Sequence, residues 1–142
     1  MAHTEISQEK IKAYKATHYR AGAGPNAFVL RIGQYSPELS KHYLASGTNS
    51  ALFITAFNPF GEVQGNEANE TAHAQLGEAL RALVTDVAEG TGADPTEKWD
   101  PELSYLALGI SAEDARELGR RFKQDAVVWA GEDAIPRLLL LR

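Results

Sequence analysis

The apolar residues of the chain follow two alternating patterns, one typical of strands and one typical of helices. Residues 51–57 form a continuous apolar run, which predicts a central strand with both faces covered. Residues 66–90 carry apolar side chains at intervals of three and four, which predicts the longest helix. That helix is expected to begin at Asn66 or Glu67 and to end near Gly90. Its buried stripe consists of Leu76, Leu80, Leu83, Val84 and Val87.

Shorter patterns, together with turn and cap residues, predict the remaining elements. Further helices are expected over residues 5–16, 36–46 and 111–122. Further strands are expected over residues 17–21, 27–33, 103–108, 126–130 and 137–141. The first two of these strands should form a hairpin, because the residues between them are glycine, proline and asparagine. Residues 90–101 remain as the longest loop.

The order of the predicted elements is α-β-β-α-β-α-β-α-β-β, which indicates a fold of class α/β to α+β. We expect a single domain, in which residues 1–16 are an N-terminal helix or extension and residues 17–142 are the core. Strands that alternate with helices usually pair in parallel through right-handed crossovers. The sequence therefore predicts a mixed sheet with a parallel central part, made of residues 51–57, 103–108 and 126–130 and flanked by helices.

Composition narrows the possible chemistry without naming a function. None of the 142 residues is cysteine, which excludes a disulfide, a thiolate nucleophile and a cysteine-ligated metal. The four histidines lack the spacing of metal ligands, so we expect no metal site. Gly22-x-Gly24 precedes a predicted strand rather than a helix, which argues against a dinucleotide fingerprint. The sequence identifies no cofactor.

Charge and hydropathy also limit the expected partners. Fourteen Lys and Arg face nineteen Asp and Glu, a formal net charge of −5, which argues against a nucleic-acid partner. No apolar stretch has the length of a membrane span or a signal peptide, so we expect no membrane partner and a cytoplasmic location. The oligomeric state does not follow from these features.

Candidate binding residues follow the predicted central strand. Asn58 and Phe60 come directly after it, at a position where open sheets commonly bind ligands. Asn58 would hydrogen-bond to a ligand, and Phe60 would cover its apolar face. Asn69 and His73 lie four residues apart in the next helix and therefore share one face. The alternatives are structural, a turn for the first pair and helix capping for the second.

A second group of candidates precedes the last strands. Trp99, Glu102 and Ser104 lead into one predicted strand, and Gln124 precedes the next. Burial of Glu102 beside a tryptophan and an apolar strand would raise its pKa, which makes it the candidate catalytic acid or base. Ser104 lies on the same strand face as Glu102, two residues on. The alternative is that these side chains only satisfy backbone groups at strand ends.

The predicted topology decides whether these residues form one site. Asn58 lies at the carboxyl end of its strand, whereas Glu102 and Gln124 lie at the amino ends of theirs. In a parallel arrangement a strand length of roughly 17–20 Å would separate them. They form one site only if the central strand is antiparallel to the other two, or if residues 90–101 reach across.

Several short motifs occur along the chain in a fixed order. They are Ile54-Thr55-Ala56-Phe57-Asn58-Pro59-Phe60, Asn69 with Leu76, Trp99 with Glu102 and Ser104, Leu108-Gly109-Ile110, and Arg121-Phe122-x-Gln124-x-Ala126-Val127-Val128-Trp129. This series resembles the bacterial family known as domain of unknown function 3293, over about residues 19–141. The resemblance implies no mechanism, because the family has no assigned activity.

The chain departs from the family's pattern at a few positions. Phe57 stands where the family has tryptophan, and His73 stands where asparagine is usual. Lys123 and Asp125 flank Gln124 where glycine and asparagine are usual. The resemblance therefore implies no fixed catalytic role for positions 73 and 125.

Two hypotheses for function remain open at this point. The first is a domain that binds a polar, nucleotide-like small molecule through Asn58, Glu102 and Gln124, with Trp99 or Phe60 stacking on it. The second is a non-enzymatic interaction or self-association module whose polar motifs are structural. A pocket that joins the three polar side chains would favour the first hypothesis, and a sheet without a cavity would favour the second.

Overall fold

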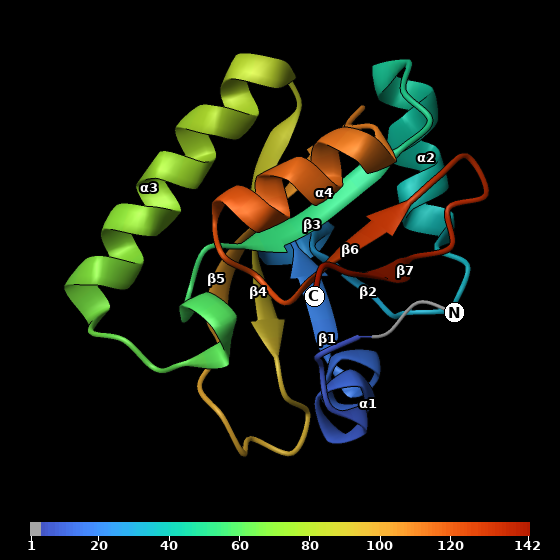
Figure 1. Ribbon diagram of the computed structural model, residues 1–142. Helices are drawn as coiled ribbons and strands as arrows, with labels where there is room; N and C mark the ends of the chain where they lie inside the picture. Colours follow the sequence, from blue (N-terminus) through green and yellow to red (C-terminus); the bar gives the residue numbers. More distant parts are fainter. Residues whose placement is uncertain (1–3) are drawn as a thin grey trace.

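A curled sheet of seven strands, a half-barrel, forms the centre of the computed structural model, which describes residues 4–142 (Figure 1). The strand order is β2-β1-β4-β5-β3-β6-β7, and every paired neighbour within these residues is antiparallel. The strands are β1 (His18–Ala21), β2 (Phe28–Leu30), β3 (Ala51–Thr55), β4 (Val87–Ala93), β5 (Glu102–Leu108), β6 (Ala126–Ala130) and β7 (Arg137–Leu140). The α-helices are α1 (Gln8–Ala16), α2 (Pro37–Ser46), α3 (Asn66–Leu83) and α4 (Ala112–Arg121), and short 3-10 turns are η1 (Gly24–Asn26) and η2 (Pro59–Gly61).

The predicted parallel centre of the sheet is wrong. Strands β5 and β6 do run in the same direction and are joined through α4, but β3 lies between them and is antiparallel to both. Alternation of strands and helices predicts the relative direction of β5 and β6. It does not say whether a strand from elsewhere in the chain fills the space between them.

The second difference from prediction is β4. The long helix ends at Leu83 rather than near Gly90, and residues 87–93 form a strand between β1 and β5. Val84 and Val87 continue the helical spacing in the sequence, but Val84 already has extended backbone angles (φ −140°, ψ 159°). Glycines at positions 90 and 92 weaken the strand pattern, because glycine is unfavourable in strand interiors.

Other local predictions are confirmed. Strands β1 and β2 form the expected antiparallel hairpin, with Tyr19 opposite Leu30. The Ser36 hydroxyl caps α2 by accepting a hydrogen bond from the Leu39 amide (3.1 Å). Gly47 ends the same helix in the left-handed conformation (φ 69°) that favours glycine.

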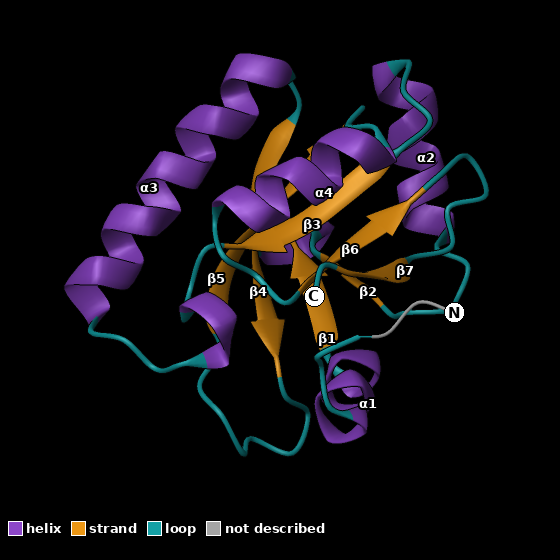
Figure 2. Ribbon diagram, viewed as in Figure 1, coloured by secondary structure: helices purple, strands orange, loops and turns teal. Residues whose placement is uncertain are grey.

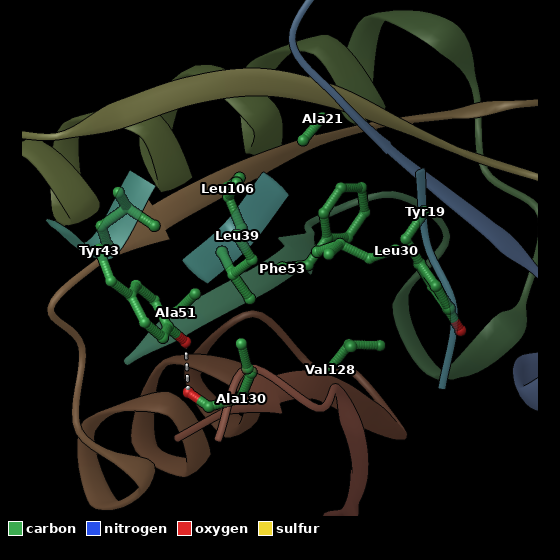
Figure 3. Close-up of a cluster of buried hydrophobic side chains, with 12 residues drawn as sticks. Tyr19, Ala21, Leu30, Leu39, Tyr43, Ala51, Phe53, Leu106, Val128 and Ala130 are labelled. Carbon is green, nitrogen blue, oxygen red and sulfur yellow. Dashed lines mark hydrogen bonds between the residues drawn. The ribbon is translucent and has the colours of Figure 1, made fainter. Parts of the chain in front are cut away.

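The concave face of the sheet holds one apolar core, which α2 covers (Figure 3). Phe53 of β3 and Val128 of β6 pack there with Leu39 of α2, and the Tyr43 hydroxyl donates to the Ala130 carbonyl (3.3 Å). The loops beside the two edge strands are hydrogen-bonded to each other, since the Gly33 amide donates to the Pro136 carbonyl (2.8 Å). Because this bond joins the two edges, the sheet must curl around the core.

Helices α3 and α4 cover the opposite, convex face of the sheet (Figure 2). A second apolar core lies beneath them. Leu76 and Leu80 of α3 are fully buried there, as the helical stripe in the sequence predicts, but Leu83 of the same predicted stripe is 52% exposed. Leu118 of α4 packs into the same cluster. Among residues 4–142 there is no helix that combines the length and the apolarity of a membrane span.

Candidate functional site

A cavity of about 370 Å³ opens on the concave face, at the end of the half-barrel where α1 lies. We call it the mouth pocket and define it by the following residues. Its aromatic lining consists of Tyr14, Tyr19, Phe53, Phe57 and Trp99. Its polar and charged lining includes Lys10, Asn58, Asp100, Glu102, Ser104 and Gln124. Figure 3 shows Tyr19, Phe53 and Val128, which lie where the apolar core meets this pocket.

The antiparallel direction of β3 brings the strand ends of the site together. Thr55 at the carboxyl end of β3 is opposite Ser104 near the amino end of β5. The Asn58 side-chain amide consequently reaches Glu102 and donates to its Oε2 (2.9 Å). Gln124, at the amino end of β6, donates from Nε2 to the backbone carbonyl of Phe57 (3.2 Å). The three polar side chains therefore line one pocket.

Asn58 occupies a backbone conformation that its hydrogen bonds hold in place. Its φ of 48° lies in the left-handed region, which asparagine tolerates better than most residues. The Asn69 Oδ1 accepts from the Asn58 backbone amide (3.0 Å), and the Asn69 Nδ2 donates to the Asn58 Oδ1 (3.1 Å). The Gln64 backbone amide donates to the Asn58 Oδ1 (3.1 Å), and the Gln64 side-chain amide donates to the Asn69 Oδ1 (2.7 Å). Asn69 is thus a positioning residue that aims Asn58 at Glu102.

Glu102 is a carboxylic acid in the mouth pocket whose pKa the protein raises. Burial raises its pKa above the usual value of 4.5, and the hydrogen bond from Asn58 opposes that rise by stabilising the charged form. Asn58 donates only to Oε2 of Glu102, and Oε1 of Glu102 makes no hydrogen bond with residues 4–142. A partly buried carboxylate with one free oxygen can accept a hydrogen bond or take up a proton from a bound molecule.

An ion cluster around the buried Asp125 lies beside the mouth pocket. The Asp125 side chain, which is 1% exposed, accepts from the Lys10 ammonium of α1 and from the Arg142 guanidinium (2.6 Å). Lys10 also donates to the Phe60 carbonyl (3.2 Å), and the Arg142 guanidinium lies 4.4 Å from the centre of the Phe60 ring. The two cations are therefore committed to contacts within the protein.

Three of the predicted site residues lie outside the mouth pocket. Asn69 supports Asn58 from α3, as described above. His73 lies on the convex side, stacked on Tyr105 (ring centroids 4.2 Å apart), and burial lowers its pKa below the usual 6.5. Its Nδ1 is buried without a hydrogen-bond partner within residues 4–142. Phe60 lines a separate, more open cavity next to Asp125.

The remaining predicted residues lie in the mouth pocket with different exposure. Ser104 is 1% exposed and donates to the Glu102 backbone carbonyl (3.1 Å), so it forms part of the floor. Trp99 is 36% exposed and lies in the loop before β5, at the rim. No cluster of three or more metal-ligating side chains occurs within the described part of the chain.

The central part of the chain matches a known protein family. The family described as "Protein of unknown function (DUF3293)" matches residues 54–127, which is just over half of the 142 residues. The chain belongs to the DUF3293 family. The DUF3293 segment extends from β3 into β6 and contains Asn58, Glu102 and Gln124. The comparisons with curated proteins and with solved structures gave no match.

The part of the site that sequence reasoning missed lies before the DUF3293 segment. Lys10, Ala13, Tyr14 and Thr17 project from the region of α1 into the mouth pocket. Their spacing of three and four residues is a helical face, and this signal was present in the sequence. The pattern could not show what the face covers, because α1 contains no fully buried residue.

Proposed function

We propose that this DUF3293 protein binds a small polar molecule in the mouth pocket. One observation carries the proposal, namely the cavity of about 370 Å³ that joins Asn58, Glu102 and Gln124. Pockets for small molecules are usually concave and mostly apolar, with a few polar groups that fix the orientation of the ligand, and begin at about 300 Å³. The aromatic walls and the three polar side chains fit that description.

The lining suggests how such a molecule would be held. The rings of Trp99 and Tyr14 offer flat apolar surfaces for a ring of the ligand, and the free oxygen of Glu102 offers a hydrogen-bond acceptor. If the bound molecule reacts, Glu102 is the group placed to exchange a proton with it, since burial raises its pKa toward neutrality.

The site favours the ring of a nucleotide-like molecule over its phosphate. Lys10 is the cation that lines the pocket, and its ammonium already contacts the Asp125 carboxylate and the Phe60 carbonyl. A phosphate in the pocket would face Asp100 and Glu102 without a free cation to balance it. A base or nucleoside would not meet this repulsion.

The proposal can be tested by filling the pocket. Gly92 of β4 lines it, and a Cβ at this position would meet only the Ser104 Oγ, at 4.0 Å. Gly92→Leu should therefore insert a side chain into the cavity without a backbone clash. Thr91→Leu, at the neighbouring position on the other face of the same strand, is the matched control.

The measurement is a thermal-shift screen with nucleosides, amines, amino acids and sugars, because a ligand of the native state raises the melting temperature. We expect at least one class to stabilise the wild type and the Thr91→Leu protein but not Gly92→Leu. A panel without any hit, or hits that Gly92→Leu leaves unchanged, would contradict the proposal. Those outcomes would favour the alternative of an interaction module with structural polar motifs.

A further inference from the structure

Of the five hydroxyl groups that line the mouth pocket, all except that of Tyr14 have committed their protons within the protein. Each of these four donates to a backbone carbonyl and keeps only its oxygen lone pairs for a ligand. The bonds are Thr17 to Ala13 (2.7 Å), Tyr19 to Tyr14 (2.6 Å), Thr55 to Leu103 (2.7 Å) and Ser104 to Glu102 (3.1 Å). A hydroxyl whose proton is committed in this way acts as an acceptor toward anything else.

The side-chain nitrogen groups of the lining, apart from the Trp99 indole, also donate within the protein. Gln124 donates from Nε2 to two backbone carbonyls, those of Phe57 and Phe122 (both 3.2 Å). The Asn58 amide donates to Glu102 (2.9 Å), and the Lys10 ammonium donates to Asp125 and to the Phe60 carbonyl. Of the lining side chains in residues 4–142, only Tyr14 and Trp99 carry a polar donor group that makes no hydrogen bond.

Acceptors in the mouth pocket, in contrast, are in excess. One oxygen of Glu102, the side-chain oxygen of Gln124 and the carboxylate of Asp100 receive no hydrogen bond from residues 4–142. The electrostatic potential has the same bias. Burial raises the pKa of Tyr14 to about 12, and the negative charges of Asp125 and Glu102 contribute to that rise while Arg142 opposes it. A ligand that enters must supply donors and, preferably, positive charge.

The aromatic walls of the mouth pocket also favour a cationic ligand. Tyr14, Tyr19, Phe57 and Trp99 bring aromatic rings to the lining, and the faces of such rings attract cations. We infer that the ligand of the mouth pocket is a protonated nitrogen base, an amine, amidine or guanidine on a flat apolar body. The inference rests on the proposed function and specifies its ligand class. The cationic group would donate to Glu102 and Gln124, and the apolar body would lie against the aromatic rings.

Three isosteric probes separate the effect of charge from that of shape. Benzamidine is cationic, benzamide is neutral and benzoate is anionic, and all three have the same flat outline. By calorimetric titration we expect the wild-type protein to bind benzamidine at least about tenfold more tightly than benzamide, since hydrogen bonds between charged groups are the stronger ones. Benzoate should bind more weakly still.

Glu102→Gln keeps the shape of the side chain and removes its charge. This variant should lose about tenfold or more in affinity for benzamidine and change its affinity for benzamide by less than about threefold. Glu132→Gln removes one charge from an exposed position outside the pocket and should leave all three affinities unchanged. Equal loss in both variants would mean that net charge, rather than the pocket, attracts the cation, and would overturn the inference.

The outcomes distinguish this inference from the proposed function. If benzamide or benzoate binds as tightly as benzamidine, and Gly92→Leu abolishes that binding, the ligand class is wrong and the pocket stands. If nucleosides stabilise the protein while benzamidine does not bind, the same conclusion follows. If no probe binds and the thermal-shift panel gives no hit, both proposals fail.

Discussion

At Glu102, two neighbouring effects act on one carboxyl group in opposite directions. Burial raises its pKa, and the hydrogen bond from Asn58 lowers it. The pKa ends above its usual value of 4.5, so burial is the larger effect. The sequence already predicted this direction from the position of Glu102 beside Trp99 and an apolar strand. It did not show the opposing amide, which comes from another part of the chain.

The raised pKa of Glu102 predicts that the ligand-free protein is less stable with the charged carboxylate than with a neutral group. Because the folded pKa lies above the unfolded value, the penalty is absent below about pH 4.5 and complete once the pH exceeds the folded pKa. Glu102→Gln should therefore melt about 1–4 °C above the wild type at pH 7, and the difference should vanish near pH 4.

The measurement is the melting temperature of both proteins between pH 4 and pH 8. Glu132→Gln, an exposed position, should show no comparable dependence on pH. A Glu102→Gln protein that melts below the wild type at pH 7 would show that the Asn58 hydrogen bond, rather than burial, dominates at this carboxyl group.

At the scale of elements, β4 shows how a strand can be hidden in a sequence. Its glycines look like loop residues, yet the fold uses both of them. A Cβ at Gly90 would lie 2.6 Å from the Arg20 carbonyl oxygen and 2.9 Å from the Phe53 ring, so the backbone of β4 can approach β1 and the core only without a side chain. Two residues later, Gly92 leaves space that becomes part of the mouth pocket.

These two glycines form a matched pair for mutagenesis. Gly90→Ala should lower the free energy of unfolding by about 2–3 kcal/mol, because the new methyl group meets backbone and a packed ring. Gly92→Ala should leave the stability unchanged or raise it by up to about 1 kcal/mol, since its methyl group enters open space and glycine is unfavourable in strands. Urea denaturation measures both values. Similar losses in the two variants would contradict the described packing of β4.

For the whole molecule, Asp125 connects segments that are far apart in the sequence. It holds Lys10 of α1 and Arg142, while the Thr4 hydroxyl donates to the Arg142 carbonyl (2.6 Å). Because α1 itself has no fully buried residue, this ion cluster, together with the buried Ile6 and Thr17 that flank the helix, holds α1 over the mouth pocket. The cluster therefore helps to fix the shape of the mouth pocket, which Lys10 also lines.

Removal of the Lys10 charge should release α1 before the rest of the fold. Lys10→Gln leaves the buried Asp125 carboxylate with one cation fewer, and we expect a loss of about 1–3 kcal/mol in unfolding free energy. Hydrogen exchange should accelerate in α1 while β3 and β5 remain protected. Lys12→Gln, on the exposed side of the same helix, is the control and should change neither quantity. If the amides of α1 exchanged at the same rate in Lys10→Gln and Lys12→Gln, this role of Asp125 would be contradicted.

Sequence reasoning predicted most local elements and selected polar residues that the structure brings together in one pocket, but it did not predict their arrangement. The buried strand at residues 51–57, the caps of α2 and the apolar stripe of α3 follow from spacing and residue type, which act within one element. The insertion of β3 between β5 and β6 depends on contacts between segments about 50 and 75 residues apart, and such contacts leave no periodic signal. Because the sequence contains no sign of this insertion, we predicted parallel pairing of the three strands, and that prediction was wrong.

By itself, the sequence of this DUF3293 protein determined which chemical groups are available to a site. It contains no thiol, its histidines lack the spacing of a metal site, and carboxylate and amide groups stand at the ends of strands. Only the tertiary structure decided that Asn58, Glu102 and Gln124 share one pocket and that α1 closes over it. The physical reason is strand direction: an antiparallel β3 places its carboxyl end beside the amino ends of β5 and β6, whereas a parallel strand would have placed it a strand length away.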